Sequence, residues 1–358
     1  MKTEHNIIFS DARNMEKIIS ETVDLIVTSP PYPMIEMWDG IFSKQNVEIK
    51  NALEKNEGNI AFELMHKELD KVWNETYRVL KNGGIACINI GDATRSLDKN
   101  FKLYSNHSRI LNHCIKIGFS VLPEILWRKQ TNAPNKFMGS GMLPVGAYTT
   151  LEHEYILILR KGNKREFKNE EEKSIRQKSA FFWEERNIWF SDIWENLKGT
   201  GQKLNHKDLR QRSGAYPFEL AYRLINMYSS YADTVLDPFL GTGTTTIASI
   251  CSARNSIGFE IDQNFSELIN ERLKELKQFS REYNINRLNN HLNFIKERKE
   301  RNKEIKHKSE HYGFEVITGQ EKNIILHHIE KISMKDRTNF QIEHKETKIQ
   351  KELNLNAF

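Results

Sequence analysis

The sequence predicts an α/β fold built on a doubly wound, mainly parallel β-sheet. Short apolar segments typical of strands alternate with longer segments whose apolar residues recur at helical spacing. Parallel neighbours in a sheet need a crossover of this length between them, usually a helix. Two of the predicted strands also end in loops of unusual composition, at the position where such sheets bind ligands.

The first predicted strands are Asn6–Phe9 and Val23–Thr28, with a helix expected between them at Met15–Ser20. Phe62–Leu80 has the apolar spacing of a helix, and the run Asn82-Gly83-Gly84 is expected to end it. The later elements, in chain order, are a strand at Ile85–Ile90, a helix at Ser108–Ile117, strands at Val121–Trp127 and His153–Arg160, a helix at Pro217–Tyr228, a strand at Thr234–Leu236, a helix at Gly243–Ser252 and a strand at Ser256–Glu260.

Composition sets the class of protein. The 358 residues can form one large or two modest domains. No apolar stretch is long enough to cross a bilayer, and the first residues, MKTEHNIIF, lack a signal-peptide pattern. The cysteines Cys87, Cys114 and Cys251 are scattered and match no metal-binding or disulfide pattern. We expect a cytoplasmic protein without metal or membrane association, whose net charge of +5 permits a polyanionic partner without requiring one.

The Val23–Thr28 strand stops at the tetrapeptide Ser29-Pro30-Pro31-Tyr32. Proline has no N–H group for a sheet ladder, and it restricts the preceding residue to extended conformations. The strand must therefore end here, and a stiff loop follows at its carboxyl end. Taken alone, the tetrapeptide also fits an ordinary surface turn.

A second unusual loop follows the Thr234–Leu236 strand, in the stretch VLDPFLGTGTTTIAS. Asp237-Pro238 makes the turn, Gly241 and Gly243 let the backbone approach a ligand, and Thr244 opens the next helix. Backbone N–H groups at the start of that helix favour an anionic group such as a carboxylate. A plain strand-to-helix turn is the simple alternative.

Two common nucleotide-binding motifs do not match this loop. A P-loop would contain GK[ST], and a dinucleotide fingerprint would have Gly or Ala where Thr246 stands. The next strand ends at Glu260 and Asp262, about 20 residues further on, where an acidic side chain typically holds ribose hydroxyls. A nucleoside that carries a small carboxylate in place of a pyrophosphate fits this combination, and S-adenosylmethionine is such a molecule.

These stretches resemble the amino-methyltransferases of DNA, which methylate the exocyclic nitrogen of cytosine or adenine using S-adenosylmethionine. The resemblance runs from Asn6 to about Leu276, with the catalytic motif before the cofactor motif, as in the β group. It implies a Rossmann-like methyltransferase sheet. The residues that match the catalytic tetrapeptide are Ser29, Pro30, Pro31 and Tyr32. The residues that match cofactor-binding positions are Asp11, Ala12, Tyr216, Pro217, Asp237, Pro238, Phe239, Gly241, Gly243, Thr244 and Glu260.

The resemblance also implies a mechanism. The exocyclic amine is a poor nucleophile, because its lone pair is delocalised into the ring. The Ser29 hydroxyl and the Pro30 carbonyl would accept its two hydrogens and free the lone pair to attack the sulfonium methyl group, as a preorganised electrostatic site does. Tyr32 would stack on the target base, once the base has left the duplex.

The first residue of the tetrapeptide bears on the substrate. Family members with Ser here are mostly cytosine-N4 enzymes, whereas Asp or Asn usually accompanies adenine-N6. The resemblance therefore implies site-specific methylation of a flipped cytosine in double-stranded DNA, with a cognate restriction endonuclease as a functional, non-physical partner. Adenine-N6 methylation is the alternative. An RNA or small-molecule methylase, or a non-catalytic binder on the same scaffold, also stays open.

Recognition of the DNA sequence is expected in residues 161–213, which are rich in charged and aromatic side chains. DNA contact and the packing of a small subdomain fit these aromatic residues equally well: Phe181, Phe182, Trp183 and Trp189. The candidate DNA-binding residues are Arg128, Lys129, Asn132, Lys136, Arg210 and Arg212.

This assignment divides the chain into four parts. Residues 1–160 form the catalytic half of the methyltransferase domain, 161–213 the target-recognition region and 214–280 the cofactor-binding half. Residues 281–358 form a charged extension, helical and partly disordered. The polar insert after Trp38, to about Gly58, is expected to be mobile without substrate.

Overall fold

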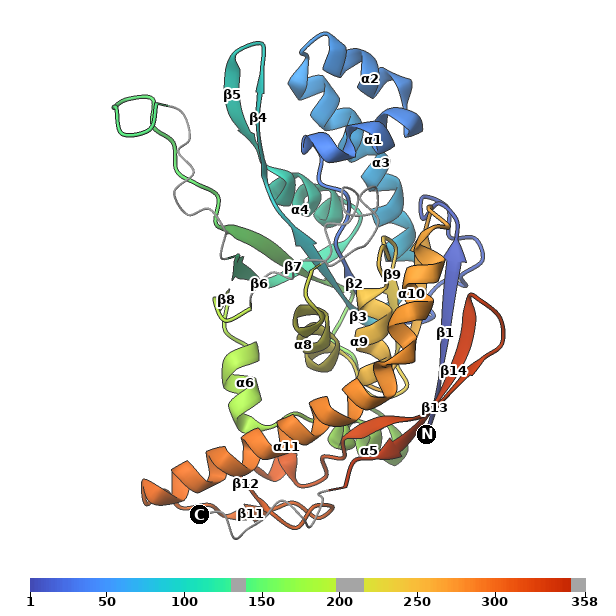
Figure 1. The fold of residues 1–358 in the computed structure, drawn as a ribbon, viewed down its shortest axis with the longest axis vertical. Coiled ribbons are helices and arrows are strands. Elements are labelled where there is room, and N and C mark those ends of the chain that lie inside the picture. Colours follow the sequence, from blue (N-terminus) through green and yellow to red (C-terminus); the bar gives the residue numbers. More distant parts are fainter. Residues whose placement is uncertain (130–139, 198–215, 349–358) are drawn as a thin grey trace.

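A ten-stranded sheet forms the centre of the computed structural model, which describes residues 1–129, 140–197 and 216–348 (Figure 1). Its strand order is β13-β14-β1-β10-β9-β2-β3-β7-β6-β8. The strands are β1 Lys2–Phe9, β2 Val23–Thr28, β3 Leu80–Ile90, β6 Phe119–Arg128, β7 His153–Lys161, β8 Ile193–Trp194, β9 Thr234–Asp237, β10 Asn255–Glu260, β13 His327–Met334 and β14 Asn339–Glu346.

Helices and two small hairpins complete the fold. The helices are α1 Asp39–Gln45, α2 Val47–Glu54, α3 Gly58–Val79, α4 Asn106–Lys116, α5 Glu170–Lys178, α6 Trp183–Trp189, α8 Phe218–Tyr228, α9 Thr244–Cys251, α10 Phe265–Lys274 and α11 Leu276–Glu300. The hairpins pair β4 Ala93–Leu97 with β5 Asn100–Tyr104, and β11 His307–Lys308 with β12 Glu315–Val316. In the described residues, no helix is long and apolar enough to cross a membrane.

The five central strands run parallel, in the order β1, β10, β9, β2 and β3. Antiparallel strands flank them, with β14 beside β1 and β7 beside β3. Successive side chains of β2 point into two different hydrophobic cores, as expected for a sheet covered on both faces. Leu25 and Val27 pack with residues of α8 and α9, whereas Ile26 packs with residues of α3 and α4. The predicted doubly wound, mainly parallel α/β fold is therefore confirmed.

Neighbouring strands β2 and β9 mark the point where the winding of the sheet reverses. Leu25 of β2 lies opposite Val235 of β9. From β2 the chain continues to β3 on one side, and from β9 it continues to β10 on the other. The carboxyl ends of two such strands leave a crevice between their loops, which is where open α/β sheets bind ligands. The two unusual loops of the sequence follow these two strands.

Two local expectations are wrong. Residues 15–20 form turns and not a helix, because α3 takes up their backbone groups: the Met15 N–H donates to Glu75 at 2.7 Å, and Arg78 donates to the Met15 carbonyl at 2.9 Å. Helix α3 ends at Val79, and the run from Asn82 to Gly84 lies within β3, where the β2–β3 register shifts.

The insert after Trp38 is folded into α1 and α2, and its mobility without substrate stays a prediction. Three of its apolar side chains, Phe42, Ile49 and Ala52, are fully or almost fully buried and belong to the core that α3 shares. An ion pair also fixes its start, because Arg95 of β4 donates to both oxygens of Asp39, at 2.9 and 2.7 Å. A polar average composition concealed this short buried face.

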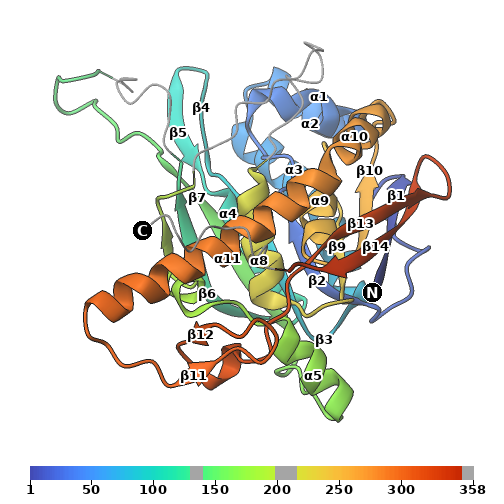
Figure 2. The ribbon, with the colours of Figure 1, turned by 60° about the horizontal axis from the view of Figure 1, so that its bottom comes forward.

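The C-terminal region extends the main sheet. Strand β14 pairs with β1 from Lys2, opposite Glu343, to Asn6, opposite Asn339. Figure 2 shows β13 and β14 beside β1, and the long helix α11 crossing in front of α8. Two paired strands of the main sheet therefore lie in a region whose composition predicted a charged helical extension. The boundaries of the four expected parts stay predictions.

The aromatic residues of α6 pack against the protein. Phe182 is fully buried and stacks on His291 of α11, with ring centroids 4.2 Å apart. Trp189 is buried against Tyr222 of α8. Trp183 keeps about a third of its surface exposed. Of the two roles considered for these aromatics, packing accounts for Phe182 and Trp189.

Candidate active site

A cavity of about 880 Å³ lies at the carboxyl ends of the central strands. Its lining comes from the segments that follow β1, β2, β9 and β10, the start of β7 and the residue after β6. Residues of α1 and α3 and the segment before α8 complete it. The expected site residues that line it are Asp11, Ala12, Ser29, Pro30, Pro31, Tyr32, Tyr216, Asp237, Pro238, Phe239, Gly241, Thr244 and Glu260, and the candidate DNA contact Lys129.

Two expected cofactor residues do not line the cavity. Pro217 precedes the first turn of α8 as its N-cap. Gly243 is the N-cap of α9 in the left-handed region, with φ of +80°. A Cβ built on Gly243 would lie 3.0 Å from Ile269 of α10. Glycine is required there for the backbone turn and for close packing, and not for approach to a ligand.

The candidate DNA contacts are divided in the same way. Arg128 is exposed, lies outside the cavity lining, and pairs with Glu152 and Glu195 at 3.1 and 3.2 Å. Four further candidates lie outside the described residues: Asn132, Lys136, Arg210 and Arg212.

Asp237 joins the two halves of the site. Its carboxylate is buried between the ends of β9 and β2, where Thr28 donates to Oδ1 at 2.6 Å and Thr245 donates to Oδ2 at 2.5 Å. The Tyr216 hydroxyl lies 3.3 Å from Oδ2 and also contacts the Thr245 hydroxyl. Burial raises the pKa of Asp237, while these hydrogen bonds oppose the rise. Two loops are thus connected through one carboxylate. They are the Ser29–Tyr32 loop after β2, which we call the catalytic loop, and the Asp237–Thr244 loop after β9, which we call the cofactor loop.

Glu260 braces the glycine loop from the end of β10. Its two oxygens accept the backbone N–H groups of Gly241 at 2.8 Å and Asp262 at 2.9 Å. Burial raises the pKa of Glu260, although the backbone hydrogen bonds oppose the rise. Each carboxylate oxygen has a second lone pair, so acceptor capacity remains for a ligand. The side chain lines the cavity, as a ribose-binding acid requires.

Asp11 follows β1 and is held in place by its neighbour. The Arg13 guanidinium donates to Asp11 at 2.7 and 2.9 Å, and to Glu68 of α3 at 2.5 Å. Burial opposes ionisation of Asp11, but the hydrogen bonds and charge of Arg13 outweigh it, and the pKa of Asp11 is lowered. The cavity wall here is a fixed charged cluster.

The residues at the ends of β2, β3 and β7 form a hydrogen-bonded chain behind the catalytic loop. The Tyr32 hydroxyl donates to Glu154 Oε2 at 3.0 Å and lies 3.2 Å from the Ser29 hydroxyl. Asn89 donates to both the Tyr32 hydroxyl, at 2.9 Å, and Glu154 Oε2, at 2.7 Å. Burial and the charge of Glu154 raise the pKa of Tyr32, so its proton stays in place.

Sequence reasoning missed Asn89 and Glu154. Both are polar residues inside apolar strand sequences, in "INI" and "EHEYILIL". A buried polar side chain in such a run must have a hydrogen-bonding partner, so each was a detectable signal. Their common partner Tyr32 comes from a loop far away in the sequence, and only the order β2-β3-β7 brings the three together.

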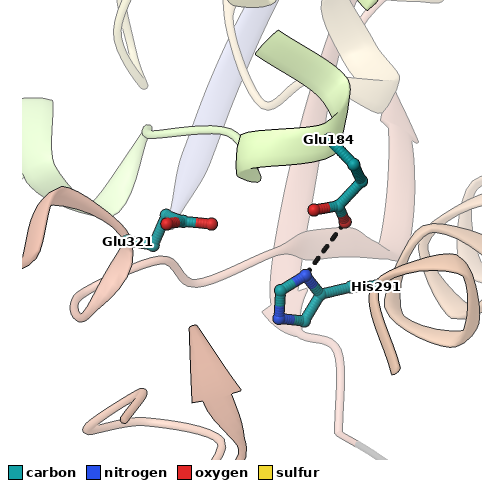
Figure 3. Close-up of side chains that lie close together, drawn as sticks. All are labelled: Glu184, His291 and Glu321. Atoms are coloured by element: carbon teal, nitrogen blue, oxygen red, sulfur yellow. Dashed lines mark hydrogen bonds and ion pairs between the residues drawn. The ribbon is translucent and has the colours of Figure 1, made fainter. Parts of the chain in front are cut away.

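A second polar cluster lies away from the cavity. Glu184 of α6, His291 of α11 and Glu321 offer ligand atoms within 4.8 Å of one another, the one group among the described residues spaced for a metal ion (Figure 3). However, both nitrogens of His291 already face acceptors, Glu184 Oε1 and the Glu315 carbonyl, each at 2.9 Å.

The charge on that histidine decides what the cluster does. Burial lowers the pKa of His291, but the ion pair with Glu184 outweighs it, and the pKa is raised. Both ring nitrogens face acceptors, so neither offers a free lone pair to a metal in this arrangement. Glu321 is also occupied, by the N–H groups of Trp183 at 2.8 Å and Thr318 at 2.6 Å. The contacts fasten α6 to α11.

The residues of the main cavity fit S-adenosylmethionine. Gly241 lines it with φ of +51°, and a Cβ built there would meet no atom closer than Phe239 O at 4.0 Å, so it would occupy open space. The braced acid Glu260 and the start of α9 at Thr244 line the same cavity. A ligand crevice at the reversal point of a doubly wound sheet, with these residues, defines an S-adenosylmethionine-dependent methyltransferase.

Comparison with known families makes the assignment specific. The family model described as "DNA methylase" matches residues 23–271. The chain belongs to this family of DNA methyltransferases, and S-adenosylmethionine is its cofactor.

Relatives with similar sequences are known in archaea and bacteria. The chain is 54% identical over 329 residues to the Type II methyltransferase M.MthZI of Methanothermobacter thermautotrophicus, covering 92% of this chain and 91% of that protein. It is 50% identical to the Type II methyltransferase M.MjaI of Methanocaldococcus jannaschii, covering 80% and 97%. A putative DNA modification methylase of Thermus thermophilus, solved with S-adenosyl-L-methionine, is 30% identical with a TM-score of 0.59, covering 76% and 94%.

Proposed function

We propose that the protein transfers the methyl group of S-adenosylmethionine to N4 of a cytosine in double-stranded DNA. The observation that carries this proposal is the position of Ser29. It follows β2 directly, lines the cavity, and is the first residue of a tetrapeptide that is anchored through Tyr32. A serine at this place, where Asp or Asn usually accompanies adenine-N6, favours cytosine-N4 in enzymes that resemble this one.

The hydrogen-bonded chain supports an acceptor role for the Ser29 hydroxyl. Tyr32 uses its one proton to donate to Glu154, so in the contact between Tyr32 and Ser29 the proton comes from Ser29. The lone pairs of the Ser29 oxygen are then left to accept an amine hydrogen of the target base. The Pro30 carbonyl accepts the second one. Pulling on both hydrogens shifts the nitrogen towards sp³ geometry and frees its lone pair for the methyl group.

The remaining steps follow from this arrangement. The base must leave the duplex, which costs a few kcal/mol, and stacking on Tyr32 returns about 1–3 kcal/mol. The methylated nitrogen is cationic and loses a proton readily, so no strong base is required. The cofactor supplies the electrophilic methyl group. Glu260, Asp11 and the Gly241 loop hold it on the β1, β10 and β9 side of β2.

The relatives suggest the biological setting. M.MthZI and M.MjaI are named Type II methyltransferases. We therefore propose that this protein protects host DNA in the cytoplasm as part of a restriction-modification system, with an endonuclease as its functional partner. Residues 161–213 would read the DNA sequence, and Arg128 would exchange its carboxylate partners for phosphates.

Transfer of label from S-adenosylmethionine tests the proposal. The protein is incubated with tritiated cofactor and, separately, duplex DNA, RNA and small amines. Label in duplex DNA that is recovered with cytosine after digestion supports the proposal. Label recovered with adenine would replace cytosine-N4 by adenine-N6 chemistry, and label only in RNA or small molecules would overturn the DNA substrate.

A further inference from the structure

The proposed mechanism leaves one edge of the target base without a partner. Ser29 and Pro30 account for the N4 amine, but cytosine also carries two acceptors, N3 and O2, beside it. A buried acceptor without a donor costs about 1–3 kcal/mol. The pocket must therefore supply N–H or O–H donors near the catalytic loop, on the side away from the cofactor.

The strand order shows where to look for that donor. The cofactor residues follow β1, β10 and β9, on one side of β2. On the other side the sheet continues through β3, β7 and β6. At the cavity edge of the sheet, these strands carry Asn89 near the end of β3, Glu154 near the start of β7 and Lys129 just after β6. Lys129 and Glu154 line the cavity together with Tyr32. Lys129 is the cationic side chain that these three strand ends contribute to the cavity lining.

Three contacts position Lys129, one through its backbone and two through its side chain. Its backbone N–H donates to the Glu152 carbonyl at 2.7 Å. Its ammonium donates to Glu154 Oε1 at 2.7 Å and lies 5.3 Å from the centre of the buried Trp127 ring. The other oxygen of Glu154 holds Tyr32, so one carboxylate sets the ammonium and the stacking ring relative to each other. A lysine ammonium has three donors, and the Glu154 contact uses one.

We infer that Lys129, positioned by Glu154, donates to the acceptor edge of the flipped cytosine and makes the pocket prefer cytosine to adenine. The inference rests on the proposed cytosine-N4 activity. Adenine has an acceptor next to its amine but a C–H where cytosine has O2. A donor aimed at O2 therefore pairs with cytosine and is left unpaired by adenine, which is the kind of mismatch that gives strong discrimination.

A change of one atom in the substrate isolates this contact. The target cytosine is replaced by 2-thiocytosine, whose sulfur accepts hydrogen bonds more weakly than O2 while the amine is unchanged. With the wild-type protein we expect kcat/KM to fall about 3- to 10-fold, the worth of one ordinary hydrogen bond. Lys129→Met should lower kcat/KM for cytosine about 10- to 100-fold and should no longer distinguish oxygen from sulfur.

Arg128→Met is the matched control. It removes the same charge from the neighbouring residue, whose side chain lies outside the cavity lining. It should keep the preference for oxygen over sulfur, even if DNA binding weakens. Should Lys129→Met turn over too slowly, the same comparison is made by the Kd values of the two duplexes with S-adenosylhomocysteine present.

The outcomes separate this inference from the proposed function. Wild-type product that is N6-methyladenine removes both. N4-methylcytosine as product, with Lys129→Met still preferring oxygen to sulfur by the wild-type factor, overturns the role of Lys129 alone. Equal kcat/KM of the wild-type protein for cytosine and 2-thiocytosine also overturns the role of Lys129. Loss of the preference in Lys129→Met, but not in Arg128→Met, is the result we expect.

Discussion

The Thr28 hydroxyl donates a 2.6 Å hydrogen bond to the buried Asp237 carboxylate, and this contact ties the strand of the catalytic loop to the strand of the cofactor loop. The two residues are 209 positions apart in the sequence. Asp237 also accepts from Thr245 at the start of α9. In the reaction that we propose, the reacting groups of base and cofactor meet across this junction, so its rigidity sets their distance.

Thr28→Val should therefore destabilise the protein. The substitution keeps the shape of the side chain and removes one hydrogen bond to a buried carboxylate, which is worth about 1.5–3 kcal/mol. Urea unfolding should show a lower free energy of unfolding by that amount, with an unchanged m-value. Thr22→Val, at an exposed threonine just before the same strand, is the matched control. The Thr22 hydroxyl donates to the Ile19 carbonyl at 2.7 Å, so this control measures the loss of an exposed hydrogen bond. A Thr28→Val variant as stable as the wild type would show that the Thr28 contact carries no weight.

Glu260 should make cofactor binding depend on pH. Ribose hydroxyls donate to its carboxylate, and protonation removes that acceptor. The affinity should have its full value above the pKa of Glu260, where the carboxylate is ionised. Because burial raises that pKa, the affinity should begin to fall at a higher pH than it would for an ordinary glutamate. Glu260→Ala should lose about 1.5–3 kcal/mol of S-adenosylmethionine binding at neutral pH and show a flatter pH profile.

Calorimetric titration measures both effects. Glu267→Gln, an exposed acid on α10, serves as the control and should bind like wild type. A Glu260→Ala variant with wild-type affinity would remove Glu260 from the cofactor site.

The two glycines of the cofactor loop should respond differently to alanine. Gly243→Ala places a Cβ 3.0 Å from Ile269 at φ of +80°, so we expect about 1–3 kcal/mol less stability. Gly241→Ala also has a positive φ, of +51°, and should lose some stability for that reason, but its Cβ lies 4.0 Å from Phe239 O, its nearest neighbour. The Cβ enters open space at the cavity lining, so we expect a smaller loss of stability than in Gly243→Ala and a larger loss of cofactor binding. Thermal unfolding and calorimetry of the two variants check this contrast. The reverse pattern would mean that Gly243, and not Gly241, faces the ligand.

The sequence predicted most of the cofactor side of the site because that information is local. Asp237, Gly241 and Thr244 lie in one stretch, and Glu260 ends the next strand. The substrate side was harder, since Asn89, Glu154 and Lys129 come from three strands whose pairing no local pattern specifies. Family resemblance supplied the catalytic tetrapeptide but not the chain of hydrogen bonds that orients it.

Local patterns also failed where tertiary contacts took over. The segment from Met15 to Ile18 has helical spacing, but it forms a single turn in which the Ile18 N–H donates to the Met15 carbonyl at 2.8 Å. Glu75 and Arg78 of α3 bond to its other backbone groups. The Asn82–Gly84 run looked like a helix end and lies in β3. Propensity is a weak prior, and buried side-chain partners override it.

Base flipping predicts tighter binding to a damaged pair. Extrusion costs less when the target cytosine is already mispaired. A duplex with a mismatch at the target should therefore bind more tightly than the paired site, provided that the other base contacts are kept. Fluorescence anisotropy with S-adenosylhomocysteine present measures both Kd values, and a mismatch outside the recognition site is the control. Equal affinities would show that extrusion is not a significant part of the binding energy.

The most direct test of the account is the chemical identity of the product in DNA from cells that express the protein. DNA is digested to nucleosides and analysed by mass spectrometry, for wild type and for Ser29→Ala. The account predicts N4-methylcytosine with the wild type. It predicts slower methyl transfer by Ser29→Ala, with an activation barrier higher by about 2.7–4 kcal/mol. The cofactor affinity of this variant should be unchanged. N6-methyladenine as the product, or turnover of Ser29→Ala within twofold of wild type in vitro, would contradict it.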